Sequence, residues 1–291
     1  DVEDGAFGEN LVVEGIDFAK LPVGTRFRCG EVVLELTQIG KECHNGCAIF
    51  QKMGECIMPR EGVFTRVLKG GKVSVGDEMT VDKAMIFDTH AHYDDEAFGG
   101  DPGECLTAAA RAGIGAVINA ATNYETAVKS LALSRKYPHF YCVLGIHPEY
   151  AETYTPETLR KIEALISSSP AVVGIGETGL DYHYLPKDDP EECSRIKQLQ
   201  KENFTANIRL AERLSLPLVV HDRDAHRDTL ALLRETVTGK TEHVLHCYSG
   251  SAELVRDFTA LNFSFSVGGV LTFKNASRLV EAVKAMPRDR I

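Results

Sequence analysis

Residues 87–92 have the sequence FDTHAH, which places two histidines one residue apart at the end of a short apolar run. Successive side chains of a β-strand alternate between its two faces, so we expect His90 and His92 to share one face, about 7 Å apart along the strand. Two imidazoles in that arrangement can ligate one metal ion. The pair is therefore a candidate for one half of a metal site.

Three later apolar runs also end in a residue that can bind a metal ion, namely Glu177, His221 and His246. A parallel-stranded barrel collects its active-site residues at the carboxyl ends of its strands, which is the pattern seen here. The alternative is that these are solvated polar residues where strands meet loops. We predict a metal centre made of five side chains: His90, His92, Glu177, His221 and His246.

Such a set could hold two divalent ions that share Glu177 as a bridge, one on the first histidine pair and the other on His221 and His246. Two ions so placed lower the pKa of water and clamp the group that it attacks, which also makes Glu177 a candidate catalytic residue. The histidine-rich set favours zinc, with manganese or magnesium as the other candidates. There is no GxSxG motif, so covalent acyl chemistry is not supported.

Further residues could assist this chemistry. His147 follows an expected strand and is a candidate catalytic or pocket-lining residue, with a structural role as the alternative. Arg223 and Lys274 are candidates to hold a phosphate, Arg223 as part of the catalytic site and Lys274 as a substrate contact, although either could be a solvated loop charge.

Residues 174–179 match the GxGxxG dinucleotide fingerprint after an expected strand. A dinucleotide loop must open directly into a helix, whereas the next helix is expected only near Pro190. We therefore attribute these glycines to a close backbone approach around Glu177.

Composition changes near residue 80 and indicates two parts. Before it, β-prone runs at 11–13, 31–36 and 62–68 are separated by Gly and Pro, which predicts a small β-rich unit. After it, strands alternate with helices whose starts are marked by proline, as at 101–104 and 155–157. The strands are expected around 86–90, 115–121, 140–146, 171–177, 217–221, 243–247 and 263–270.

The expected fold class is α/β: a TIM-type (β/α)8 barrel that stops before strand 8, preceded by the β-rich unit. Seven strand–helix units are complete, and Arg290 and Ile291 look like the start of an eighth strand. A doubly wound sheet would gather its ligands at one switch point rather than around a ring. The expected boundaries are 1–80 for the first domain, 81–84 for the linker and 85–291 for the barrel.

The hydropathy, cysteine content and net charge of the chain limit the functions that it can have. No apolar run approaches the roughly 20 residues of a membrane helix, so no membrane association is expected. The eight cysteines lack the spacing of a disulfide framework, which favours the cytoplasm. A net charge of −10 argues against a protein that coats nucleic acid, but not against an enzyme that meets one phosphate at a time. Oligomeric state is not predicted.

From Met85 onward the chain resembles the TatD family of metal-dependent deoxyribonucleases. The resemblance lies in blocks 87–92, 145–148, 176–181, 221–225 and 246–250, in the order of that family. It implies a TIM-type barrel, the two-metal centre on the five side chains above, and hydrolysis of phosphodiesters in DNA or a small phosphodiester. The family normally adds an aspartate on the eighth strand, so metal binding and turnover are separate predictions for these residues.

Residues 7 to about 80 resemble the later part of a MOSC domain, a module related to molybdenum cofactor sulfurases. Blocks 7–11, 21–25, 40–43 and 56–62 carry the similarity. It implies binding of molybdenum cofactor or carriage of sulfur, with Cys43 in the position of the family's cysteine. From the residues alone, Cys43 could be a reactive thiol beside Lys41 or, equally, a structural cysteine, while the Cys-x3-Cys spacing to Cys47 is wrong for a zinc knuckle.

Two alternatives to a deoxyribonuclease stay open. In one, the MOSC-like part supplies the biological function as a cofactor-binding or sulfur-carrier protein and the barrel is inactive. In the other, the metals are kept but the substrate is an amide or a lactone.

Overall fold

The computed structural model describes residues 9–21, 23–40, 50–51, 61–82 and 86–291. The chain divides into two compact units, Asp1–Ile86 and Phe87–Ile291. Among the described residues, no helix is long and apolar enough to cross a membrane.

The first unit contains a four-stranded antiparallel sheet in the order β3-β2-β1-β4. Its fully described elements are the 3-10 helix η1 (Phe18–Lys20) and the strands β1 (Arg26–Cys29), β2 (Val32–Ile39), β3 (Val63–Lys69) and β4 (Met79–Asp82). Alternate residues of β1 and β2 are buried, and Phe27, Val32, Leu34 and Leu36 form a small core.

The expected runs at 31–36 and 62–68 correspond to β2 and β3. The expectation of a strand at 11–13 is wrong: these residues form no strand, and Leu11 and Val12 are exposed. Three apolar residues without a partner strand gain too little buried surface to stay extended in a sheet. Strands β1 and β4 were not anticipated, because both are short and β1 alternates with arginines.

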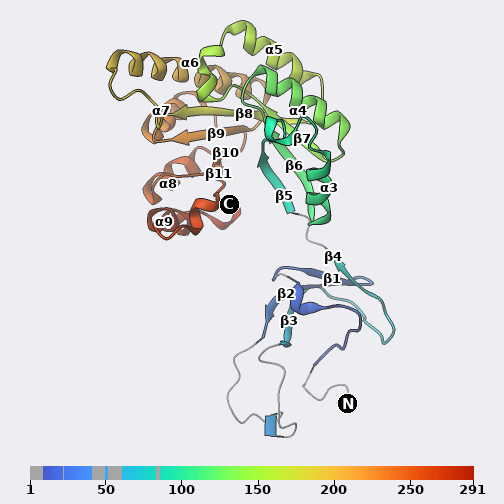
Figure 1. Ribbon diagram of the computed structural model, residues 1–291. Helices are drawn as coiled ribbons and strands as arrows, with labels where there is room; N and C mark the ends of the chain where they lie inside the picture. The colour runs from blue at the N-terminus through green and yellow to red at the C-terminus, as the bar shows by residue number, and fades with distance from the viewer. Residues whose placement is uncertain (1–8, 22, 41–49, 52–60, 83–85) are drawn as a thin grey trace. The chain divides into compact units, whose positions relative to one another are not determined.

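The part of the chain from Ile86 onward carries a seven-stranded sheet in the order β11-β10-β9-β8-β7-β6-β5, in which β6 to β11 run parallel. The sheet curls into an open half-barrel with helices around it (Figure 1). The strands are β5 (Ile86–Ala91), β6 (Ile114–Ala120), β7 (Phe140–Leu144), β8 (Val172–Asp181), β9 (Leu218–Arg223), β10 (His243–His246) and β11 (Phe263–Phe265).

A helix follows each of these strands in the chain. The α-helices are α3 (Gly103–Arg111), α4 (Tyr124–Lys136), α5 (Pro156–Ser167), α6 (Pro190–Leu214), α7 (His226–Thr236), α8 (Ala252–Ala260) and α9 (Ser277–Ala285). The 3-10 helices are η2 (Glu96–Phe98), η3 (Pro148–Thr153), η4 (Gly269–Thr272) and η5 (Arg288–Arg290). All seven expected strands after residue 85 are therefore present, and the α/β fold class is confirmed.

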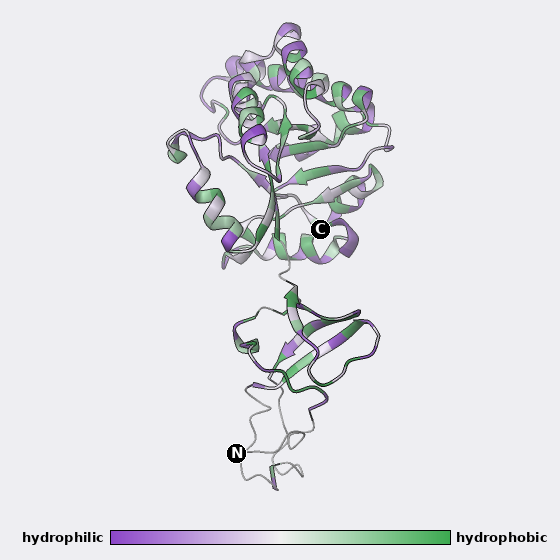
Figure 2. Cartoon of the chain, turned by 90° about the vertical axis from the view of Figure 1, so that its right-hand side faces the viewer, coloured by the Kyte–Doolittle hydropathy of each residue, from purple (hydrophilic) through white to green (hydrophobic). Residues whose placement is uncertain are grey.

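The core of this unit fills the space between sheet and helices. Phe204 of α6, Phe258 of α8 and Leu144 of β7 have no exposed surface, and each such side chain contributes roughly 1.5–3 kcal/mol by burial. In Figure 2 the strands of this unit are largely coloured as hydrophobic, whereas hydrophilic and hydrophobic residues alternate along the helices around them.

Helix starts follow the expected chemistry with small shifts. Thr155 caps α5 by accepting a hydrogen bond from the backbone N–H of Thr158, and Pro156 is the first helical residue. At α3, Pro102 rather than Asp101 is the cap residue, and Asp101 instead accepts from the backbone N–H of Gly103.

The expectation that Arg290 and Ile291 begin an eighth strand is wrong. Arg290 ends the 3-10 helix η5, where its backbone N–H donates to the carbonyl of Pro287 at 2.9 Å. Its guanidinium donates to Asn262 Oδ1 at 2.8 Å, which holds it against the start of β11 rather than in a new strand.

Candidate metal centre

The carboxyl ends of four strands bring the five expected ligands into one neighbourhood. His90 lies in β5 and His92 directly after it, while Glu177 lies in β8. His221 of β9 is the register partner of both Gly179 in β8 and His246 in β10. Parallel register thus sets these side chains side by side at the same end of the sheet.

The first group of donors is His90, His92 and Glu177. Nε2 of His90 lies 3.0 Å from Glu177 Oε2 and 3.3 Å from Nε2 of His92. Nδ1 of His92 donates to the carbonyl of Ala120 at 2.9 Å, so its Nε2 carries the lone pair that faces the group. Two imidazole nitrogens and a carboxylate oxygen, with one nitrogen oriented from behind, fit a divalent transition ion.

The second group is His147, Glu177 and His221. Glu177 Oε1 lies 3.0 Å from Nδ1 of His221 and 3.9 Å from Nε2 of His147. Glu177 therefore turns one oxygen to each group, which is the arrangement that a bridging carboxylate requires.

Among the described residues, His246 belongs to neither of these two donor groups. Its ring stacks on that of His90, with centroids 3.4 Å apart and an interplanar angle of 11°. The structure therefore brings His246 to the site but sets His147, rather than His246, beside His221 and Glu177.

Burial and hydrogen bonding shift the pKa values of the side chains in this cluster in opposite directions. Burial raises the pKa of Glu177, but hydrogen bonds from His221 and His90 hold it well below its ordinary value. Burial lowers the pKa of His221, yet its bonds to Asp181 and Glu177 raise it to about 9. Burial lowers the pKa of His147 to about 4, so this imidazole is neutral at pH 7.

Glycines allow the strands to approach closely around Glu177. A Cβ on Gly179, whose φ is +147°, would lie 1.9 Å from the carbonyl oxygen of His221. At Gly176, with φ +149°, it would lie 2.6 Å from the carbonyl oxygen of Val219. In addition, β8 runs on to Asp181 and the next helix begins only at Pro190. The glycine motif therefore serves strand packing, as expected, and not a dinucleotide loop.

Asp181, which sequence reasoning did not single out, orients His221 from behind. Its buried carboxylate accepts from Nε2 of His221 and from the backbone N–H of His183, both at 2.9 Å. This leaves Nδ1 of His221 to face Glu177. The only sequence signal was an acidic residue four positions after Glu177 near a strand end.

A stripe of buried amides on α6, made of Gln200, Asn203 and Asn207, supports the site and was also missed. Gln200 accepts from the backbone N–H of Asp181 and donates to its carbonyl, each at 2.9 Å. Asn203 donates to the carbonyl of Ile146 at 2.8 Å, next to His147. Asn207 donates in turn to Asn203. Helix α6 thus fixes two strand ends that carry site residues.

The two basic candidates form no hydrogen bond or ion pair with these donors within residues 86–291. Arg223 ends β9, and its guanidinium contacts the ring of Tyr184. Lys274 is exposed in the turn after η4, and no hydrogen bond or ion pair recorded for residues 86–291 joins it to the donors. Cys43 lies outside the described residues.

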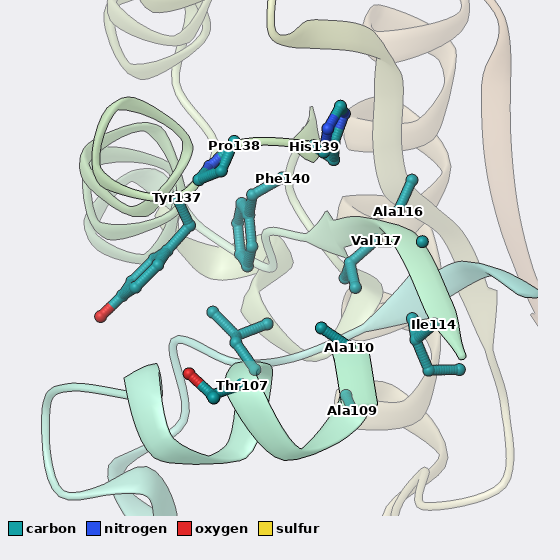
Figure 3. A pocket seen from close by; sticks show the side chains of 12 residues that line it. Thr107, Ala109, Ala110, Ile114, Ala116, Val117, Tyr137, Pro138, His139 and Phe140 are labelled. Atoms are coloured by element: carbon teal, nitrogen blue, oxygen red, sulfur yellow. The ribbon is translucent and has the colours of Figure 1, made fainter. Parts of the chain in front are cut away.

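One apolar cavity in this unit lies away from the metal centre. It measures about 250 Å³ and lies between α3 and the amino ends of β6 and β7, where Figure 3 shows Ala110, Val117 and Phe140 among its lining. It offers no cluster of titratable groups, so the chemistry belongs to the opposite rim.

Comparison with known proteins gives two matching family models. The model described as TatD related DNase matches residues 87–291, and the MOSC domain model matches residues 1–80.

The metal-dependent hydrolase YabD of Bacillus subtilis is 36% identical over 209 residues, which cover 71% of this chain and 78% of that protein. The 3'-5' ssDNA/RNA exonuclease TatD of Cronobacter turicensis is 30% identical over 207 residues, 71% of this chain and 75% of that one. The crystal structure of YjjV, a TatD homologue from Escherichia coli, superimposes with a TM-score of 0.63 at 32% identity, covering 70% of this chain and 76% of that chain.

Proposed function

This chain belongs to the TatD-related DNase family and is a metal-dependent hydrolase, and from that premise we propose that it cleaves phosphodiester bonds of nucleic acid. A relative whose name is 3'-5' ssDNA/RNA exonuclease supports this substrate over the amide or lactone alternative.

The observation that carries the proposal is the position of the Glu177 carboxylate. Its two oxygens each lie 3.0 Å from a different histidine, Oε2 from His90 and Oε1 from His221. A carboxylate shared in this way suits two divalent ions, which would supply Lewis-acid activation of water and of the phosphodiester. His90 and His92 would hold one ion and His221 the other, while zinc, manganese or magnesium remain the candidate metals.

His246 and His147 act beside these ligands. The stacked ring of His246 closes one side of the His90 imidazole. Nδ1 of His147 accepts a hydrogen bond from the backbone N–H of Glu149 at 3.3 Å, so the neutral ring carries its proton on Nε2. We assign His147 the role of a hydrogen-bond donor, through its Nε2–H, to a phosphoryl oxygen of the substrate, because negative charge grows on that oxygen during attack.

The test combines metal analysis with hydrolysis of a single-stranded oligonucleotide by the wild type, Glu177→Gln and a control, Glu157→Gln. Glu157 is an exposed carboxylate in the first turn of α5. We expect Glu177→Gln to lose bound metal and to lower kcat/KM by at least about 100-fold, because both groups lose their shared ligand. Metal content and activity equal to those of the control would refute the site.

For residues 1–80 we retain the hypothesis that the MOSC-like part binds molybdenum cofactor or carries sulfur through Cys43. The match of these residues to the MOSC domain model is the ground for it. Molybdenum and pterin analysis of the full chain and of Cys43→Ser tests it, and equal contents in both proteins would refute the role of Cys43.

A further inference from the structure

An exposed tyrosine stands on the rim beside the metal centre. Tyr184 lies in the loop after β8 and is 68% exposed, the largest exposure of any aromatic residue in the described chain. Its neighbour Tyr182 differs, because its hydroxyl donates to Asp228 at 2.7 Å and Lys197 covers its ring at 4.7 Å. Tyr182 is therefore part of the framework, while the ring of Tyr184 is open to a ligand.

Two side chains hold Tyr184 in place although its ring is exposed. The guanidinium carbon of Arg223 lies 5.0 Å from the ring centroid, and Nη1 donates to the tyrosine hydroxyl at 3.2 Å. The His183 ring meets Tyr184 edge-on at 87° and 4.7 Å, and its Nδ1 lies 2.8 Å from Asp224 Oδ2. An exposed aromatic ring that is already ordered loses little conformational entropy on binding.

The strand register sets this ring close to the ligands. Arg223 is the register partner of Asp181, whose carboxylate contacts His221. Arg223 and His221 are two residues apart in β9, so their side chains leave the same face about 7 Å apart. No ion pair recorded for residues 86–291 engages Arg223, so its charge is available to a nucleic acid.

We propose that Tyr184, braced by Arg223 and His183, is a stacking platform for one unpaired base of a nucleic-acid strand whose phosphodiester lies at Glu177. Every base has a π-face, so the platform is tolerant of sequence. A base inside a duplex already stacks on its neighbours, and the platform therefore favours single strands and frayed ends. The inference rests on the proposed function, which supplies the phosphodiester.

The test measures binding of a fluorescent phosphorothioate (dT)10 by anisotropy, beside a phosphorothioate of the same length in which every base is absent. The proteins are the wild type, Tyr184→Leu and Tyr184→Phe. We expect Tyr184→Leu to weaken binding of (dT)10 by about 5- to 150-fold, while Tyr184→Phe stays within about threefold of the wild type, because stacking needs only the ring. All three should bind the abasic strand equally.

The salt dependence separates stacking from charge. We expect the slope of log K against log salt to be the same in Tyr184→Leu and the wild type, since no phosphate contact is removed. A Tyr184→Leu protein that binds (dT)10 as tightly as the wild type, or that loses the abasic strand equally, would overturn the platform.

Cleavage assays keep the two proposals distinct. If the wild type cleaves neither a normal nor an abasic phosphodiester strand, the proposed hydrolysis fails, while the binding comparison still decides the platform. If the wild type cleaves both strands and Tyr184→Leu cleaves both equally well, hydrolysis stands and the platform is refuted.

Discussion

Asp181→Asn tests whether the carboxylate behind His221 controls metal binding. In the native site, Asp181 accepts from Nε2 of His221, so Nδ1 is the nitrogen that faces Glu177 and would hold the ion. Asparagine has the same shape, and its Oδ1 can still accept from the backbone N–H of His183. Its NH2 group then faces Nε2 of His221, which must become the acceptor, and the ring proton moves to Nδ1 on the ligand side.

The expected cost is a 10- to 100-fold loss of metal affinity, the usual effect of removing a carboxylate behind a ligating histidine, or about 1.4–2.7 kcal/mol. Competition with a chromophoric chelator measures the dissociation constants for zinc and manganese. Hydrogen bonds raise the pKa of His221 to about 9, so ¹⁵N NMR of the histidines in the metal-free protein is recorded at about pH 10.5, where the ring is neutral and its tautomer can be read. Urea unfolding checks that the fold is retained.

Asp188→Asn is the matched control, because Asp188 is an exposed carboxylate in the loop that follows β8. Affinities of Asp181→Asn within about twofold of this control, or an unchanged His221 tautomer, would refute the reasoning.

Two further predictions concern stability. Gly179→Ala should lower the free energy of unfolding by more than about 3 kcal/mol in urea titrations, because its Cβ would overlap the carbonyl of His221. The control is Gly239→Ala, which has φ +72° and open space around it and should cost only about 1–2 kcal/mol. Equal losses in the two variants would contradict the clash. Nδ1 of His226 lies 2.9 Å from Asp222 Oδ2, and this carboxylate raises the pKa of His226. Protonated His226 therefore stabilises the fold below about pH 6.5, and this contribution is lost as the pH rises through the raised pKa. His226→Gln should therefore destabilise more at about pH 6 than at about pH 9, and a pH-independent difference would argue against the ion pair.

The strands after residue 85 could be predicted because most of them are short apolar runs that lie between helical segments. Val172 to Ile175 and Leu218 to Val220 are buried on both faces of the curled sheet, apart from the half-buried Val173, so they read as continuous hydrophobic segments. Strand β1 escaped this test, because arginines occupy its exposed positions and only Phe27 and Cys29 face the small core.

The ligand types could be predicted, but their grouping could not. Strand alternation indicated that His90 and His92 share a face, and their Nε2 atoms indeed lie 3.3 Å apart. Sequence does not reveal which ring lies beside which, so the stacking of His246 on His90 and the approach of His147 to Glu177 required coordinates. Gln200 and Asn203 escaped for another reason: on a helix, a buried amide and a solvated one have the same sequence signature.

The amide stripe of α6 also connects one helix to two segments that carry residues of the metal centre. Gln200 forms hydrogen bonds with the end of β8, and Asn203 forms one with the chain beside His147. A tilt of α6 would therefore move both segments in the same direction. Relative motion between those two segments would break buried hydrogen bonds, at roughly 1–3 kcal/mol for each group left unpaired. We therefore expect the end of β8 and the segment beside His147 to keep the same separation while these hydrogen bonds are intact.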